Sequence, residues 1–147
     1  MIDSLIAIFE RDLNKLIKQL EMYSSESALW KVDGTISNSG GTLALHICGN
    51  LQHFIGATLG NSGYIRQRDL EFSRRDVSLS EMLEEINTTS NIVKQTLENL
   101  DHNKLSENYP INVFGKEMTT EFFLLHLTTH LSYHLGQVNY HRRLLDI

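Results

Sequence analysis

The chain has little cysteine, little proline and no long apolar segment. Its 147 residues contain one cysteine, Cys48, and one proline, Pro110. A single cysteine cannot form an internal disulfide, which excludes a disulfide-stapled fold, and we interpret Cys48 as a small core residue. No segment approaches the ~20 apolar residues that a membrane-spanning helix needs. The sequence therefore predicts a protein without membrane spans, stabilised by packing alone.

A surplus of positive charge is also missing. Thirteen Lys and Arg residues stand against 18 Asp and Glu residues, which gives a net charge of −5. Such a balance, with a pI near 5.8, provides no general attraction to nucleic acid or to an anionic membrane surface. The N-terminus has an acidic residue at position 3 and no basic residue before its apolar run, unlike an export signal. We therefore expect a cytoplasmic protein that binds neither nucleic acid nor membranes.

Four segments carry apolar residues at helical spacing. Their predicted bounds are Asp3 to Tyr23, an N-cap at Asn38 or Ser39 to about Gly60, a capping box of Ser78 and Glu81 to about Leu100, and Thr119 to beyond Arg143. A chain of this length fits one domain, so residues 1–147 are predicted to form a single all-α domain, a four-helix bundle. The connections are long, which leaves a crossover topology open.

The three connections are predicted to be loops. The first is rich in Ser, Gly and Asn, and its Trp30 is expected to pack back onto the helices. The last, from Asp101 to Met118, is expected to be a loop with a short extended piece, and we assign no role to His102 there.

Histidines are concentrated on two of the predicted helices. The last helix has four at spacings of four, four and seven, which places them within an arc of roughly 80° on one face: His126, His130, His134 and His141. The second helix has His46 and His53 seven apart, with Asn50 on the same stripe. Burying several imidazoles is unfavourable unless a shared cation accepts their lone pairs. One histidine from one helix and an i, i+4 pair from another would bind a divalent metal and leave a coordination position open.

Several other site chemistries lack their residues. His126 and His130 enclose no glutamate, so the H-E-x-x-H pattern of zincin proteases is absent. The last helix has no acid between Glu121 and Asp146, which excludes a carboxylate-bridged di-iron site. No glycine-rich phosphate loop and no Cys/His nucleophile pair is present. A histidine-bound metal is the remaining candidate.

The segment between the second and third helices is unusually rich in arginine. It contains four arginines mixed with acidic residues, at positions Arg66, Arg68, Arg74 and Arg75. One interpretation is a solvated surface of mutually paired charges, and the other is an anion-binding rim over the metal pocket. The sequence leaves both open.

The pattern resembles the DinB-like superfamily of bacterial four-helix-bundle metalloproteins over nearly the whole chain. The final helix, with H-x-x-x-H-x-x-x-H-L-G-Q from His126 to Gln137, is similar to the family's run of spaced histidines ending in H-x-G-Q, and the leucine-rich stretch around His46 is similar to its other motif. The resemblance implies an up-down-down-up bundle in which His46, His130 and His134 bind one divalent metal, with water or an anion completing the shell. It also implies a homodimer. Zinc and nickel both accept imidazole, with manganese and iron as alternatives.

The functional expectation follows from the same resemblance. Family members include thiol-dependent S-transferases and an isomerase, in which the metal activates a low-molecular-weight thiol. We therefore expect an enzyme that activates a thiol or water against a small substrate, with no catalytic residue assigned beyond the metal-bound nucleophile. The alternative is a non-catalytic bundle that binds a metal or small ligand for stability or sensing.

Four further residues are predicted to surround the metal. Asn50 and Gln137 lie one turn from ligands on the same faces and should contact the bound water, a ligand imidazole or the substrate, unless they make ordinary interhelical hydrogen bonds. If the second and fourth helices are antiparallel, His53 and His126 should be neighbours that form a polar pocket wall. The alternative is two separate core histidines. His141 should stand apart from both, on the other side of the metal.

Overall fold

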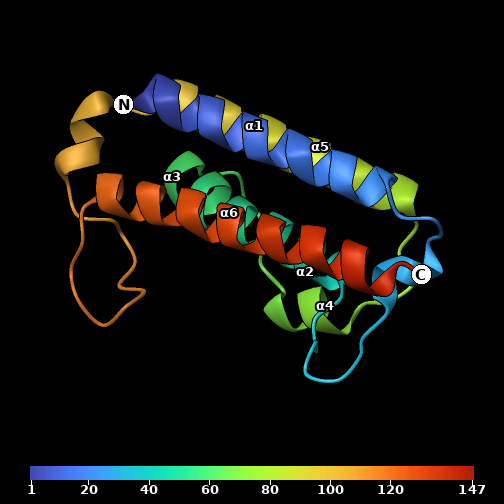
Figure 1. The fold of residues 1–147 in the computed structure, drawn as a ribbon. Helices are drawn as coiled ribbons and strands as arrows, with labels where there is room; N and C mark the ends of the chain where they lie inside the picture. The colour runs from blue at the N-terminus through green and yellow to red at the C-terminus, as the bar shows by residue number, and fades with distance from the viewer.

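The computed structural model describes residues 1–147 and is all-helical, without strands. Its longest helices are α1 (Ile2–Glu21), α5 (Leu79–Glu98) and α6 (Thr120–Leu145). A fourth helical stretch consists of α2 (Gly40–Leu51), the π-helical segment η2 (Gln52–Ala57) and α3 (Thr58–Gly60). These four stretches pack on one another around one continuous core (Figure 1). No helix is both long and apolar enough to cross a membrane.

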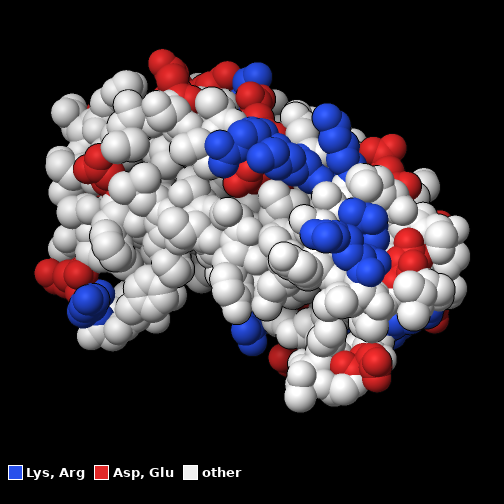
Figure 2. All heavy atoms as spheres, viewed as in Figure 1, with Lys and Arg blue, Asp and Glu red and all other residues white.

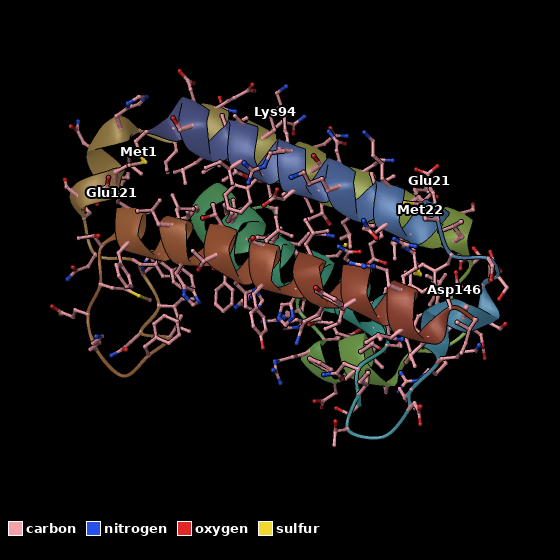
Figure 3. The ribbon with its side chains drawn as sticks, viewed as in Figure 1. Met1, Glu21, Met22, Lys94, Glu121 and Asp146 are labelled. Carbon is pink, nitrogen blue, oxygen red and sulfur yellow. The ribbon has the colours of Figure 1, made fainter.

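The directions of the helices follow from their ends. Met1 and Glu121 lie at one end of the molecule, and Glu21 and Asp146 lie at the other, so α1 and α6 point the same way (Figure 3). The α2–α3 stretch and α5 run in the opposite direction (Figure 1). The backbone N–H of Ser24, just after α1, donates to the carboxylate of Asp146 at a distance of 2.9 Å. This bond joins the last turns of the two parallel helices.

Helix α2 is the central element, because all of its residues are buried. It begins where the sequence predicts, since Ser39 is the N-cap and its hydroxyl accepts a hydrogen bond from the backbone N–H of Thr42. The stretch also ends as predicted after Gly60, where Asn61 adopts a left-handed conformation with φ of 49°. Trp30, at the end of the 3-10 helix η1 (Ser27–Trp30), packs against the core as predicted.

The π-helical segment η2 was not predicted. A π turn holds more residues than an α turn, so it leaves backbone groups without their usual partners and rotates the following side chains around the axis. The hydroxyl of Tyr109 donates a hydrogen bond to the carbonyl of Phe54 within this segment. The loop before α6 therefore stabilises the irregular part of the central helical stretch.

The prediction that the whole segment between the second and third helices is a loop is wrong in one part. Residues Arg68–Ser73 form the short helix α4, which packs on α2. No side chain caps this helix. The reason for it is tertiary, because its Glu71 is buried at 6 % exposure against Gly49 of α2. The residues of α4 therefore carry little local sequence signal for a helix.

The remaining boundaries agree with the sequence analysis. The capping box of Ser78 and Glu81 opens α5, and Thr119 caps α6 by accepting from the backbone N–H of Phe122. The connection before α6 contains a short 3-10 helix, η3 (His102–Ser106), that was not predicted. The extended piece predicted for this connection amounts to an isolated bridge between Asn108 and Thr119.

Candidate metal centre

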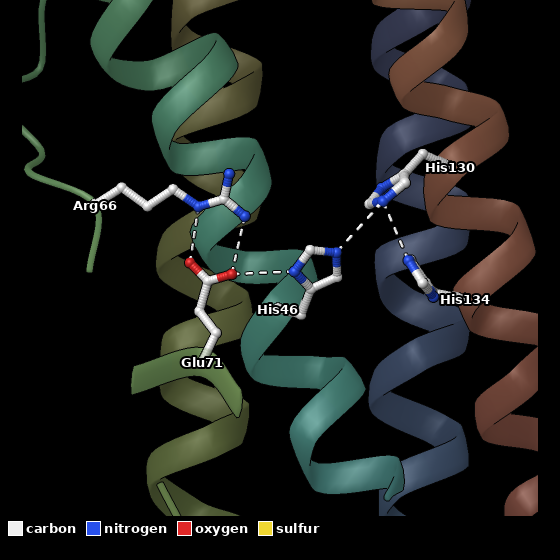
Figure 4. Close-up of polar contacts among 5 residues, drawn as sticks. All are labelled: His46, Arg66, Glu71, His130 and His134. Atoms are coloured by element: carbon white, nitrogen blue, oxygen red, sulfur yellow. Dashed lines mark hydrogen bonds and ion pairs between the residues drawn. The ribbon is translucent and has the colours of Figure 1, made fainter. Parts of the chain in front are cut away.

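Three histidines from two helices bring their ring nitrogens together. His46 lies on α2, and His130 and His134 lie one turn apart on α6. The Nε2 atom of His130 is 3.4 Å from that of His46 and 3.1 Å from that of His134 (Figure 4). One ligand atom from each residue lies within 4.8 Å of the other two, which is close enough to bind one metal ion.

The outer nitrogens of two of these rings have hydrogen-bond acceptors. Nδ1 of His46 donates to Glu71 Oε1 at 3.0 Å, and Nδ1 of His134 donates to Gln137 Oε1 at 2.7 Å. A neutral imidazole that donates from Nδ1 has only a lone pair at Nε2. His130 could donate from its own Nε2 to one of the two facing nitrogens but not to both. A central cation would accept all three lone pairs at once.

The distances between the nitrogens also suit a metal. A zinc–nitrogen bond of about 2.0–2.1 Å gives a separation of about 3.3–3.4 Å between two nitrogens of a tetrahedral shell. The two Nε2 separations that involve His130, 3.4 and 3.1 Å, are close to this value, and the remaining pair of ligand atoms lies within 4.8 Å. The donor set and its spacing therefore fit a divalent cation that accepts imidazole.

Glu71 is a site residue that the sequence analysis missed. Its carboxylate accepts from His46 and also from Arg66, whose Nε and Nη2 atoms lie 2.8 and 2.9 Å from its two oxygens (Figure 4). The side chains of Arg66 and Glu71 are only 11 % and 7 % exposed. This pair is neither a solvated surface pair nor a free anion-binding rim, the two interpretations of the arginine-rich segment. It is buried behind His46, a candidate metal ligand, and fixes the ring of that residue.

One signal for Glu71 was present in the sequence. Gly49 interrupts an otherwise leucine-rich helix, three residues after His46. A Cβ atom at Gly49 would lie 2.0 Å from Glu71 Oε2, so any larger residue would displace the carboxylate. An interior helix glycine marks a close approach by another segment. The sequence does not say which segment approaches.

The protonation equilibria favour a neutral His130, a neutral His134 and an ionised Glu71. Burial, followed by the neighbouring imidazoles of His134 and His46, lowers the pKa of His130 to about 4. Burial also lowers the pKa of His134. Burial alone would raise the pKa of Glu71, but hydrogen bonds from Arg66 and His46 lower it below its usual value. The lowered pKa values of His130 and His134 therefore favour the deprotonated form that a metal ligand needs.

We expect the metal-free protein to lose stability as pH falls from about 6.5 to about 4. Histidines in the unfolded chain bind protons near pH 6.5, whereas the folded-state pKa of His130 is about 4. Between these values the unfolded state binds more protons than the folded state, so the free energy of unfolding becomes smaller as the pH falls. Urea unfolding at a series of pH values with a chelator present measures this decrease. His130→Ala should flatten it, and a constant wild-type stability across this window would contradict the prediction.

A cavity of about 290 Å³ opens beside the triad. Two histidines of the triad, His46 and His130, lie in its lining, and Asn50 and His126 lie there as well. Aromatic and aliphatic side chains form much of the remainder, namely Phe54, Val113, Phe114, Phe123 and Leu127. A small molecule in this cavity would lie against the candidate ligands.

His53 and His126 are not brought together. The ring contacts of His126 are with Phe114, Phe123 and His130, whereas that of His53 is with its neighbour Phe54. Phe54, rather than His53, follows His46 and Asn50 in the cavity lining. The wider turn of the π-helical segment explains this, because it rotates the residues after Asn50 around the helix axis.

His141 is held away from the triad as a core histidine. Its Nε2 donates to the carbonyl of Lys31 at 2.8 Å, and its Nδ1 lies 2.7 Å from the hydroxyl of Tyr23. The residue is 3 % exposed. Both ring nitrogens therefore have partners within the protein, and His141 ties the end of α6 to the segment that follows α1.

Tyr23→Phe is expected to destabilise the protein without affecting metal binding. The substitution leaves the buried Nδ1 of His141 without a partner, which should cost about 1–3 kcal/mol of unfolding free energy. Chemical denaturation with a chelator present measures the loss, and a zinc titration provides the comparison. A fall in zinc affinity comparable to that of a ligand variant would show that His141 belongs to the metal centre.

A comparison with protein families assigns the chain to one of them. The family model described as "Protein of unknown function (DUF1572)" matches residues 2–146, which is nearly the whole chain and includes every residue of the candidate centre. No curated protein sequence matches the chain significantly. The chain therefore belongs to the DUF1572 family.

Proposed function

We propose that this protein is a metal-dependent enzyme of the DinB-like kind, which uses one divalent cation to activate a thiol or water against a small substrate. The observation that carries the proposal is the convergence of one ring nitrogen from each of three histidines, all within 4.8 Å of one another, at the edge of a cavity. The proposed fold is the up-down-down-up four-helix bundle, made by α1, the α2–α3 stretch, α5 and α6. The proposed partner is a small molecule, and a homodimer is proposed only on the family resemblance.

Each residue of the centre has a distinct part in this proposal. His46, His130 and His134 would hold the metal, which lowers the pKa of a bound thiol or water and so supplies a nucleophile. Glu71 and Gln137 hold the rings of His46 and His134 by their outer nitrogens. The apolar side chains of the cavity exclude water around a bound substrate, which strengthens electrostatic interactions there. Zinc and nickel fit the all-imidazole set best, with manganese and iron as alternatives.

Three protein ligands favour reactivity over a purely structural role. Structural zinc sites are usually closed by four protein ligands, whereas catalytic sites keep a position open. The groups that could come together to hold a cation are His46, His130 and His134, with no fourth His, Cys, Asp or Glu among them. Glu71 is engaged with Arg66 and with the outer nitrogen of His46. A fourth position would therefore be left for substrate or solvent.

The second candidate is a non-catalytic metal-binding bundle. It is favoured by the position of the triad, which bridges α2 and α6. A shared cation would crosslink these helices and stabilise the fold without any reaction.

The discriminating experiment is a panel of low-molecular-weight thiols, each combined with an electrophilic acceptor, assayed with metal-loaded wild-type protein and with His130→Ala. The proposal predicts metal-dependent thiol consumption by the wild type and none by the variant. Water as the nucleophile is tested in parallel with activated esters and amides. No turnover with any pair, together with a large fall in melting temperature on chelation, would support the binding bundle instead.

A further inference from the structure

The lining of the cavity beside the triad combines aromatic side chains with two arginines. Among the aromatic side chains, the imidazole of His126 is stacked on the ring of Phe123 at 5.7 Å between centroids, and Phe114 meets His126 edge-on at 4.8 Å. The lining also contains two arginines, Arg66 and Arg68. No Asp or Glu lines the cavity. Figure 2 shows a hollow between the loop before α6 and the region of α4, bordered largely by uncharged residues.

Arg68 is the cation available to a ligand. Arg66 is already bound through two nitrogens to Glu71. Arg68 forms no ion pair, and its guanidinium lies over the ring of Phe72, 5.0 Å from the centroid. Phe72 in turn contacts His46, with ring centroids 5.0 Å apart. The aromatic ring therefore holds an unpaired guanidinium at the cavity, near the candidate metal ligands.

Asn50 provides an independent sign of a ligand. It is 6 % exposed, lines the cavity, and its Oδ1 atom has no hydrogen-bond partner. Buried polar side-chain atoms are nearly always hydrogen-bonded, because an unpaired one costs about 1–3 kcal/mol. This oxygen is inaccessible in the present conformation, so the amide would turn about its Cβ–Cγ bond to meet a polar group of a bound molecule.

We propose that this cavity binds a small organic carboxylate, with its carboxylate on Arg68, its apolar body against Phe54, Phe114 and Phe123, and a polar group near Asn50. This inference rests on the proposed function and names the substrate class of the same site. The volume of about 290 Å³ is at the lower end of the roughly 300–1,000 Å³ found for drug-sized ligands, which restricts the molecule to a small one.

The arrangement suits a carboxylate better than a phosphate. A single free guanidinium presents a planar fork that matches the two oxygens of a carboxylate. Phosphate sites usually add further donors, such as several backbone N–H groups at a long helix N-terminus. The only other cation in the lining, Arg66, is neutralised by Glu71.

The test compares phenylacetate with its uncharged analogue phenylacetamide. Both are titrated calorimetrically into full-length protein, once zinc-loaded and once metal-free, and the zinc content is measured separately. Phenylacetate should bind more tightly than phenylacetamide to both the zinc-loaded and the metal-free protein. Arg68→Gln should weaken phenylacetate binding about tenfold or more and leave phenylacetamide unchanged, whereas Phe114→Ala should weaken both probes.

Arg143→Gln is the matched control. Arg143 is also an exposed arginine stacked on an aromatic ring, 5.3 Å from the centroid of Tyr140, but it lies outside the cavity. This variant should bind phenylacetate as the wild type does. Equal loss in Arg143→Gln and Arg68→Gln, equal affinity for the two probes, or no binding at about 10 mM, well above a 1 mM dissociation constant, would each overturn the inference.

The metal-free arm separates this inference from the proposed function. If phenylacetate bound only to zinc-loaded protein and Arg68→Gln had no effect, the carboxylate would be contacting the metal, and the inference would be wrong while the metal centre remained. If zinc did not bind at all but phenylacetate binding still depended on Arg68, the carboxylate site would stand and the proposed metal chemistry would fail.

Discussion

Replacing His130 by alanine is expected to weaken zinc binding about a hundredfold or more. His130 is the middle member of the triad, because its Nε2 lies near the Nε2 atoms of both His46 and His134. Zinc sites of four ligands contribute roughly 10–16 kcal/mol, or about 2.5–4 kcal/mol per ligand, so the loss of one ligand should cost about 3 kcal/mol. A competition titration with a chromophoric chelator measures the affinity.

The metal-free form of the same variant should be close to the wild type in stability at neutral pH. In the absence of metal, His130 is a partly desolvated imidazole crowded by two others, and it gains little from them. His126→Ala is the control on the same helix face, because His126 lines the cavity but is not in the triad. If His126→Ala lost as much zinc affinity as His130→Ala, the ligand assignment would be wrong.

Replacing Glu71 by glutamine should reduce both stability and metal affinity. The substitution leaves the guanidinium of Arg66 buried without its counter-ion, which typically costs about 3–5 kcal/mol and corresponds to roughly 10–15 °C in melting temperature for a domain of this size. It also weakens the acceptor that orients His46, and losing such a partner typically lowers metal affinity about 10–100-fold. Thermal unfolding with a chelator and a zinc titration measure the two effects separately.

Two further variants make this result interpretable. Arg66→Gln combined with Glu71→Gln should regain part of the stability, because no buried charge is then left unpaired. Glu107→Gln removes a carboxylate paired with Lys104 on the surface, where both side chains are more than half exposed, and should change stability by no more than about 1 kcal/mol. Wild-type stability and zinc affinity in Glu71→Gln would refute the role assigned to the Arg66–Glu71 pair.

The features predicted correctly from the sequence depend on contacts within a few residues. The capping box of Ser78 and Glu81 and the N-caps of Ser39 and Thr119 are local hydrogen-bond patterns, and they determine where the helices begin. The i, i+4 spacing of His130 and His134 similarly requires both rings to lie on one face of α6. Local spacing is therefore sufficient to indicate a ligand pair on the last helix.

The features missed depend on contacts between distant segments. Helix α4 has no side-chain cap, and its Glu71 is placed by its contact with His46 of α2, 25 residues earlier in the chain. The π-helical segment is stabilised by Tyr109, 55 residues after Phe54 in the chain. An ideal helical wheel cannot include such an irregular turn, which is why it placed His53, rather than Phe54, in the cavity lining.

The central claim is that His46, His130 and His134 bind one metal ion, and metal stoichiometry tests it most directly. The protein is purified without a metal-affinity tag, reconstituted with zinc, passed through a desalting column and examined by elemental analysis beside the variant His46→Ala/His130→Ala/His134→Ala. The account predicts about one equivalent of zinc in the wild type and less than about a tenth in the triple variant. Less than about a tenth of an equivalent in the wild type, or equal zinc in both proteins, would contradict it.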